Sequence, residues 1–287
     1  CIMTLKKEFT AFVKDELAIP LVGIASADDF PREDVERITP VLRLFARSTP
    51  LAEGIDSVLH ARDFLPEARA VVVTGMPGYF GRMKSFEECR KELLGSAEPS
   101  HVDTHNMQIS QERGYRLQEF FTGRGYQCFH AAGMQFPVKL AASLCGVGFY
   151  GKNAVIQHPA YGAWIALMAY ITDAELEPDK PLEEKCPDNC TLCLEACPTG
   201  ALYAPYRCDA ARCLDFNLGH NKKNIPDDIR EKSGNLIGEG CTACRDACPK
   251  NRALIPSQEG LPPAELLNPY LPNLFDMTDE QWEQGYG

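Results

Sequence analysis

The sequence lacks any run of about 18 or more consecutive apolar residues, the length that a membrane-spanning helix requires. Its longest apolar candidate, AWIALMAYI at 163–171, has the length of a core strand or a short helix. The first residues, CIMTLKKEFTAF, lack the apolar run of a secretory signal and carry no twin-arginine pair. We therefore expect no membrane partner and a cytoplasmic location.

Positive charge is also in short supply. The chain has 29 Lys and Arg against 40 Asp and Glu, which gives a formal net charge of −11. Proteins that hold nucleic acid over a broad face normally carry a basic surface, so stable nucleic-acid binding is not expected. An acidic surface can instead influence the docking of a redox partner. With 287 residues, of which 45% are hydrophobic, the chain can build one large domain or two ordinary ones.

Cysteine, in contrast, is abundant and unevenly spread. Nine of the 13 cysteines fall between Cys186 and Cys248, and such crowding indicates metal ligands because structural disulfides are rare in reducing compartments. The stretch CPDNCTLCLEACP at 186–198 has the spacing C-x3-C-x2-C-x3-C-P, and CTACRDACP at 241–249 has C-x2-C-x3-C-P. Zinc is the alternative, but zinc sites favour separated C-x2-C pairs and do not require the terminal proline.

This doubled motif resembles that of bacterial two-cluster ferredoxins, in which the cysteine before proline ligates the other cluster. It predicts two 4Fe-4S clusters, which need eight thiolates. The first motif supplies four and the second three, so one more must come from the intervening chain, where Cys208 and Cys213 are available. The crossed pattern predicts one cluster on Cys186, Cys190, Cys193 and Cys248, and the other on Cys197, Cys241, Cys244 and one of these two.

Hydrophobic periodicity and turn residues predict a mixed order of helices and strands before the cysteine motifs. An acidic, proline-bearing stretch at 172–185 is expected to connect to the cysteine-rich region. The expected helices are 4–17, 106–124 and 138–145, and the expected strands or extended segments are 20–27, 70–77, 125–132, 153–159 and 163–171.

The segment GVGFYGKN at 146–153 matches both G-x-G-x-x-G and most of G-x-x-x-x-G-K. A dinucleotide site needs a strand before the glycines and a helix after them, so that the helix N-terminus faces phosphate. Here a helix is expected before the glycines and extended chain after them. We therefore predict that Gly146 ends the helix and that the segment is no phosphate loop.

Several ordered segments resemble one family, the iron–sulfur, cobalamin-dependent reductases typified by tRNA epoxyqueuosine reductase, with the reductive dehalogenases as relatives. The resemblance spans about residues 60–287. It is carried by GVGFYGKNAVIQHPAYGAWIALMAYITDAELEPD, CTLCLEACPTGAL, ARCLDF, IPDDIREKSGNLIGEGCTACRDACPKN and LPNLFDMTDEQW. Within the family, the short motif ARCLDF supplies the lone ligand of the second cluster, which selects Cys213 over Cys208.

The resemblance implies an α+β fold, with an N-terminal nitroreductase-like, cobalamin-binding α/β domain followed by a bacterial two-4Fe-4S ferredoxin-like domain. The expected domains are residues 1–175 and 176–257, with a C-terminal tail, 258–287, that packs on both. A corrinoid (cobalamin) would lie against the glycine-rich segment and the strand that follows. The expected cofactor-binding residues are Gly146, Gly148, Gly151, Asn153, Ile156, Gln157 and His158. For His158 the alternative is a histidine satisfied by its own turn before Pro159.

The proton donor is the point at which the chain departs from this family. Epoxyqueuosine reductases carry an aspartate fourteen residues before the first glycine of the segment, where this chain has Ala132. The candidates that remain are Tyr150, with Lys152 beside it to lower its pKa, and the pair Asp103 and His105, which could equally cap a helix.

The resemblance implies an oxidoreductase that passes electrons from two 4Fe-4S clusters to the bound corrinoid and reduces an organic substrate. A ferredoxin or flavodoxin would be the electron donor, and the substrate would be small or of nucleoside type. The alternative is an electron-transfer protein or a corrinoid-protein reductase with no organic substrate of its own.

Overall fold

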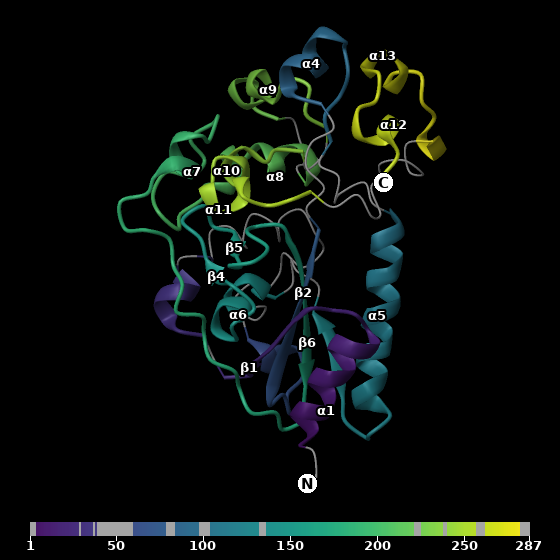
Figure 1. Cartoon of the computed structure of the whole chain (residues 1–287), viewed down its shortest axis with the longest axis vertical. Coiled ribbons are helices and arrows are strands. Elements are labelled where there is room, and N and C mark those ends of the chain that lie inside the picture. Colours follow the sequence, from purple (N-terminus) through teal and green to yellow (C-terminus); the bar gives the residue numbers. More distant parts are fainter. Residues whose placement is uncertain are drawn as a thin grey trace.

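The computed structural model describes residues 4–28, 30–36, 38, 60–78, 84–97, 104–131, 136–220, 225–237, 240–256 and 262–281, with the backbone alone at 86 and 104–110. Its centre is an antiparallel sheet of four strands in the order β1-β2-β6-β3 (Figure 1). The strands are β1 (Leu21–Ser26), β2 (Ala70–Pro77), β6 (Ile165–Thr172) and β3 (Cys128–Ala131). The β-branched run of β2 predicts this strand with the bounds observed.

One face of the sheet is covered by the N-terminal helix and by the long helix α5 (Thr104–Thr122). The N-terminal helix begins as α1 (Leu5–Ala11), capped by Thr4, and continues as a π-helical turn, η1 (Phe12–Glu16). Phe9 packs against Phe120 and Phe121 of α5 at ring-centroid distances of 5.2 and 4.8 Å, edge-on to the first ring and tilted to the second. No helix in the described part of the chain is long and apolar enough to span a membrane.

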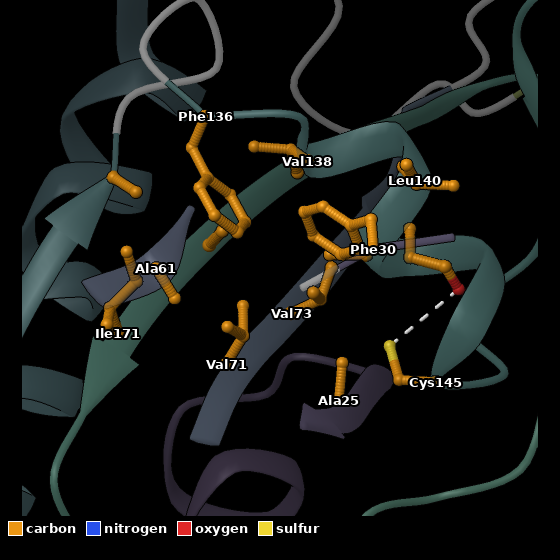
Figure 2. Packing of buried hydrophobic residues seen from close by; sticks show 14 of the residues in the cluster. Ala25, Phe30, Ala61, Val71, Val73, Phe136, Val138, Leu140, Cys145 and Ile171 are labelled. Carbon is orange, nitrogen blue, oxygen red and sulfur yellow. Dashed lines mark hydrogen bonds between the residues drawn. The ribbon is translucent and has the colours of Figure 1, made fainter. Parts of the chain in front are cut away.

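The other face carries α6 (Val138–Leu144), the helix that leads into the glycine-rich segment. Alternate strand residues such as Val71 and Val73 point toward this helix, while Ala70 and Val72 point to the opposite face. Figure 2 shows the packing between sheet and helix, with Phe30 and Phe136 at a ring-centroid distance of 5.7 Å. The α/β part is therefore a three-layer arrangement, and α6 leads from it into the glycine-rich segment.

The cysteine-rich part is built from short helices and loops. It contains α7 (Leu192–Glu195), η4 (Ala210–Arg212), α8 (Leu214–Gly219), α9 (Asp227–Ser233), α10 (Ala243–Asp246) and α11 (Pro249–Arg252). In Figure 1, α7, α10 and α11 lie above the small hairpin of β4 (Phe149–Tyr150) and β5 (Ile156–Gln157). The predicted extended segment 153–159 is thus a strand only at 156–157, because a turn occupies 151–154.

The acidic connection at 172–185 is docked on the sheet edge. The carboxylate of Asp179 pairs with Lys6 at 2.7 Å and accepts the backbone N–H of Ile24 at 2.9 Å. The backbone N–H of Asp179 in turn donates to the carbonyl of Ile24 at 2.7 Å. These contacts fix the connection along β1.

The C-terminal helices α12 (Ala264–Leu267) and α13 (Leu271–Leu274) pack beside the segment 93–97. The backbone N–H groups of Gly95 and Ala97 donate to the carbonyls of Pro269 and Leu267. The helix α4 (Phe86–Lys91), just before this segment, lies at the same end of the molecule (Figure 1), whereas α3 (Ala61–Phe64) precedes β2. Segments from the first third of the chain and from its C-terminal part therefore meet there, and the three-part division at 175 and 257 stays a prediction.

Candidate functional site

The glycine-rich segment begins where α6 ends. Gly146 has a φ of +76°, and a Cβ on it would lie 2.7 Å from the carbonyl oxygen of Lys180 in the docked connection. Only glycine suits this left-handed position beside another backbone. The helix precedes the glycines and extended chain follows Gly146, so the expected order of elements, the reverse of a phosphate loop, is confirmed.

The next two glycines are required by the hairpin itself. A Cβ on Gly148 would lie 2.3 Å from Ile156 Cγ2, and one on Gly151 would lie 2.6 Å from Asn153 Oδ1. Their side-chain space is filled by the chain's own atoms. The need for glycine at both positions is therefore explained by packing within the hairpin, before any ligand is considered.

Asn153 and Gln157 form a buried amide pair in this hairpin, 5% and 2% exposed. Gln157 Nε2 donates to Asn153 Oδ1 at 3.3 Å, and the same oxygen accepts the backbone N–H of Val155. Asn153 Nδ2 and Gln157 Oε1 have no hydrogen-bond partner among the described residues. Buried polar groups of this kind are normally completed by a ligand or an ordered water.

The other predicted cofactor residues differ in their surroundings. Ile156 is buried in the core between sheet and α6. His158 Nδ1 accepts the backbone N–H of Ala160 at 3.1 Å, and its ring stacks on Tyr161 at 5.1 Å. Burial lowers the pKa of His158. The imidazole is thus neutral near pH 7 with its proton on Nε2, and its turn supplies a local partner.

Of the candidate catalytic residues, Tyr150 is half-buried at the end of β4 and packs against the core between sheet and α6. His105 belongs to the first turn of α5, where the structure describes the backbone alone, and Asp103 and Ala132 lie outside the described residues.

Lys152 is directed at the first cysteine loop. Its Nζ donates to the carbonyl oxygens of Pro187, Asp188 and Cys190 at 2.6, 2.8 and 3.0 Å. These three bonds use every proton of the ammonium group. The sequence predicts that Lys152 acts on its neighbour Tyr150, whereas its ammonium group is bonded to a loop more than thirty residues further along the chain. No pattern in the local sequence indicates such a distant contact.

A second anchor joins the same part of the chain to the other cysteine motif. Asn251, 3% exposed, accepts the backbone N–H of Ala163 at 2.8 Å and donates to the carbonyl of Arg245 at 2.7 Å. The guanidinium of Arg245 lies 4.5 Å from the centre of the Trp164 ring, and Lys250 Nζ lies 5.4 Å from that of Phe149. Sequence reasoning missed Asn251, because one asparagine after a C-P pair has no distinctive pattern.

The cysteine thiols fall into two groups. Burial raises the pKa of Cys193, and the nearby thiols of Cys186, Cys190 and Cys248 raise it further. Burial likewise raises the pKa of Cys241 to about 11, with contributions from Cys213 and Cys197, and that of Cys244 to about 12, with contributions from Cys241 and Cys213. Each group therefore combines thiols from the two motifs.

Cys208 lies beside Cys213. The two thiols interact closely, and this interaction together with burial raises the pKa of Cys208. Of these two candidates, Cys213 is the one whose thiol also raises the pKa of both Cys241 and Cys244, so it lies with the thiols of the second motif.

The cysteine-rich part defines the class of the protein. Residues 185–251 match the 4Fe-4S double cluster binding domain. Together with the α/β layers before it, this domain makes the chain an iron–sulfur oxidoreductase that binds two 4Fe-4S clusters.

Similarity to known proteins extends over nearly the whole of this chain. The chain is 29% identical to the epoxyqueuosine reductase of Bacillus subtilis over 99% of its own length and 73% of that relative. It superposes on a structure of the B. subtilis enzyme, with its catalytic aspartate loop swung out of the active site, at a TM-score of 0.85 and 27% identity, over 99% of this chain and 75% of that one. A structure of an epoxyqueuosine reductase with a tRNA-Tyr stem loop gives 0.84 and 27% over the same shares. The chain is a homologue of the epoxyqueuosine reductases, a family of enzymes.

Proposed function

We propose that this protein uses its two clusters to deliver electrons to a corrinoid held against residues 146–158, and so reduces an organic substrate. The observation that carries the proposal is the likeness to epoxyqueuosine reductases over 99% of the chain, which takes in the α/β layers as well as the cluster domain. A protein that only carried electrons would not need the roughly 185 residues that precede the first motif.

The proposed cluster ligands are the two crossed groups of cysteines. One consists of Cys186, Cys190, Cys193 and Cys248, and the other of Cys197, Cys213, Cys241 and Cys244. The mutual influence of their thiols supports this division, since Cys248 of the other motif raises the pKa of Cys193, and Cys197 raises that of Cys241. Crossed ligation of this kind is the rule in two-cluster ferredoxins.

The hairpin offers groups that suit a corrinoid. Asn153 and Gln157 leave one amide donor and one amide acceptor to be completed, and the carboxamide groups around a corrin ring supply the complement of both. His158, neutral and with an N–H at Nε2, can donate from the same strand end. When bound, the clusters would supply single electrons and the corrinoid a low-valent cobalt centre for the substrate.

Tyr150 is the proposed proton donor. It sits between the glycines and the turn, and its phenol can give up a proton to a substrate held above the hairpin. No carboxylate occurs in the sequence from 126 to 137, the stretch around Ala132. Asp103 and His105 stay as further candidates.

The substrate is proposed to be of nucleoside type. One relative has been captured with an epoxyqueuosine-modified tRNA stem loop, which suggests a modified nucleoside within tRNA. The net charge of −11 favours a transient encounter with such a substrate over stable binding of nucleic acid. A ferredoxin or flavodoxin is the proposed electron donor.

A corrinoid-protein reductase is the second candidate. It is favoured by the lack of a carboxylate at Ala132 and its neighbours, because a protein with no organic substrate needs no proton donor there. In this case the corrinoid would belong to a partner protein.

Metal analysis separates these candidates. We expect the protein, purified anaerobically from cells supplied with cobalamin, to contain about eight irons and one cobalt per chain, given the ligand count for two cubes. It should then convert an epoxyqueuosine-bearing stem loop or nucleoside when given a strong reductant. Iron without cobalt after reconstitution, together with reduction of a separate corrinoid protein, would replace the first proposal by the second.

A further inference from the structure

The cation of Lys152 is buried, which is unusual for a lysine without a carboxylate partner. Lys152 is 5% exposed, and its ammonium group forms no ion pair with any of the described residues. Among the described residues, the hydrogen-bond partners of the ammonium are the carbonyl oxygens of Pro187, Asp188 and Cys190. Carbonyl dipoles satisfy its hydrogen bonds, but they leave its full positive charge in place.

This charge lies in the loop of one cluster. Cys190, whose carbonyl is 3.0 Å from Lys152 Nζ, is a proposed ligand, and the other two carbonyls belong to the residues between Cys186 and Cys190. The backbone of Lys152 is held as well, because its carbonyl accepts the N–H of Tyr206 at 2.9 Å. The lysine is therefore fixed at both ends.

A fixed, buried cation acts on redox chemistry through its charge. A 4Fe-4S cluster becomes more negative when it gains an electron, and its reduction potential depends on nearby charge, hydrogen bonds and exposure to solvent. Water screens buried charges much less than exposed ones. A cation at this place therefore stabilises the reduced cluster more than the oxidised one.

Lys232 provides the contrast. Its Nζ donates to the carbonyl of Pro198 at 2.8 Å, directly after the ligand Cys197 of the other cluster, but this lysine is exposed. Solvent screens its charge, so it should influence the neighbouring cluster only weakly.

We infer that Lys152 is a positioning residue which holds a positive charge beside the cluster of Cys186, Cys190, Cys193 and Cys248 and favours its reduced form. The inference rests on the ligand sets proposed above. It gives the hairpin a role in electron flow: the strand end that bears the cofactor residues also sets how readily the adjoining cluster accepts an electron.

The test is a redox titration of the anaerobic holoprotein, followed by EPR, with iron measured on the same samples. At a fixed potential, we expect Lys152→Gln to lower the ratio of reduced to oxidised form of one cluster at least tenfold, which equals about 59 mV for one electron. Lys152→Arg, which keeps the charge, should change this ratio less than about twofold, and Lys232→Gln should change the ratio of the other cluster, beside which it lies, less than about twofold. A Cys193→Ser ligand exchange identifies the signal of the affected cluster.

Two results would overturn the inference. The first is a Lys152→Gln protein with its full iron content and an unchanged ratio of reduced to oxidised cluster. The second applies if Lys152→Gln loses its iron: a tenfold change of the ratio in Lys152→Arg contradicts the role of the charge, whereas a ratio close to that of the unaltered protein supports it. Absence of clusters from the unaltered protein would instead refute the proposed function.

Discussion

At the scale of single residues, the glycine-rich segment is shaped by backbone contacts. Gly146 ends α6 in a left-handed conformation and faces the carbonyl of Lys180. Gly125, with a φ of +84°, shares this conformation but has nothing within 4 Å of its missing Cβ. A side chain at Gly125 would therefore meet conformational strain alone, whereas one at Gly146 would meet both strain and a steric contact.

We predict that Gly146→Ala destabilises the protein by about 3 kcal/mol or more, since the left-handed strain and a backbone clash add together. Gly125→Ala should cost only about 1–2 kcal/mol, the strain alone. Thermal unfolding of the two variants measures the difference. Equal losses would show that the contact with Lys180 contributes nothing.

His158 gives a prediction for pH dependence. Burial lowers its pKa in the folded protein, so the unfolded chain takes up a proton first as the pH falls below about 6.5. Stability should therefore decrease from that pH down to the folded pKa, with no loss above it. His158→Asn, whose amide can still accept the N–H of Ala160, should show a smaller decrease in melting temperature between pH 7.5 and 5.5.

The same sign applies to His130, whose pKa is also lowered by burial. His130→Asn should reduce the pH dependence independently, and the double variant should reduce it further. A His158→Asn protein with the full pH dependence of the unaltered chain would contradict this account of the histidine.

The role proposed for Tyr150 concerns its hydroxyl group alone. Tyr150→Phe keeps the ring that packs on the core, so we expect both clusters to be retained while the rate of substrate reduction falls by about 10²–10⁴. Tyr161→Phe is the matched control, because its ring stacks on His158 and it has no proposed part in proton transfer. Full activity in Tyr150→Phe would assign the proton to another group.

At the scale of elements, the segment 149–163, which contains the hairpin of β4 and β5, is tied to both cysteine loops. Lys152 holds the first loop and Asn251 connects the second to Ala163. We predict that Asn251→Ala costs about 1–3 kcal/mol, since it leaves the buried N–H of Ala163 without an acceptor. Asn273→Ala, at an exposed position, should be near neutral. Differential scanning calorimetry of the holoprotein measures both, and equal melting temperatures would exclude Asn251 as an anchor.

Local patterns predicted the elements that depend on local sequence. The β-branched run at 70–77 predicts a strand with the observed bounds, and α6 ends at Leu144, just before Gly146, the glycine that predicts its end. The long-range contacts could not be predicted, because Lys152 and Asn251 find partners about 36 and 88 residues away. The residue pattern of one segment does not indicate which distant carbonyl or N–H group will form a hydrogen bond with its side chains.

The cysteine motifs are the exception to this limit. Their spacing predicts which thiols come together from opposite motifs, because cluster geometry dictates the pairing. Spacing alone does not decide between Cys208 and Cys213 as the lone ligand of the second cluster. The influence of the Cys213 thiol on both Cys241 and Cys244 provides a physical reason to prefer Cys213.

At the scale of the whole molecule, the fold places a three-layer α/β domain directly beneath the cluster loops (Figure 1). The docked connection at 172–185, the hairpin and the C-terminal helices hold the two parts together. Such an arrangement keeps electron carriers at a fixed position relative to the hairpin, which suits a reductase better than a mobile carrier.

The most direct test of this account is EPR of anaerobic protein in which single ligands are changed to serine. We predict two 4Fe-4S signals, one altered by both Cys193→Ser and Cys248→Ser and the other by both Cys197→Ser and Cys241→Ser. Cys89→Ser, at a buried position outside both motifs, should alter neither signal. Zinc in place of iron, or signals that sort Cys248 with Cys241 and Cys193 with Cys197, would contradict the crossed arrangement on which the proposed electron path depends.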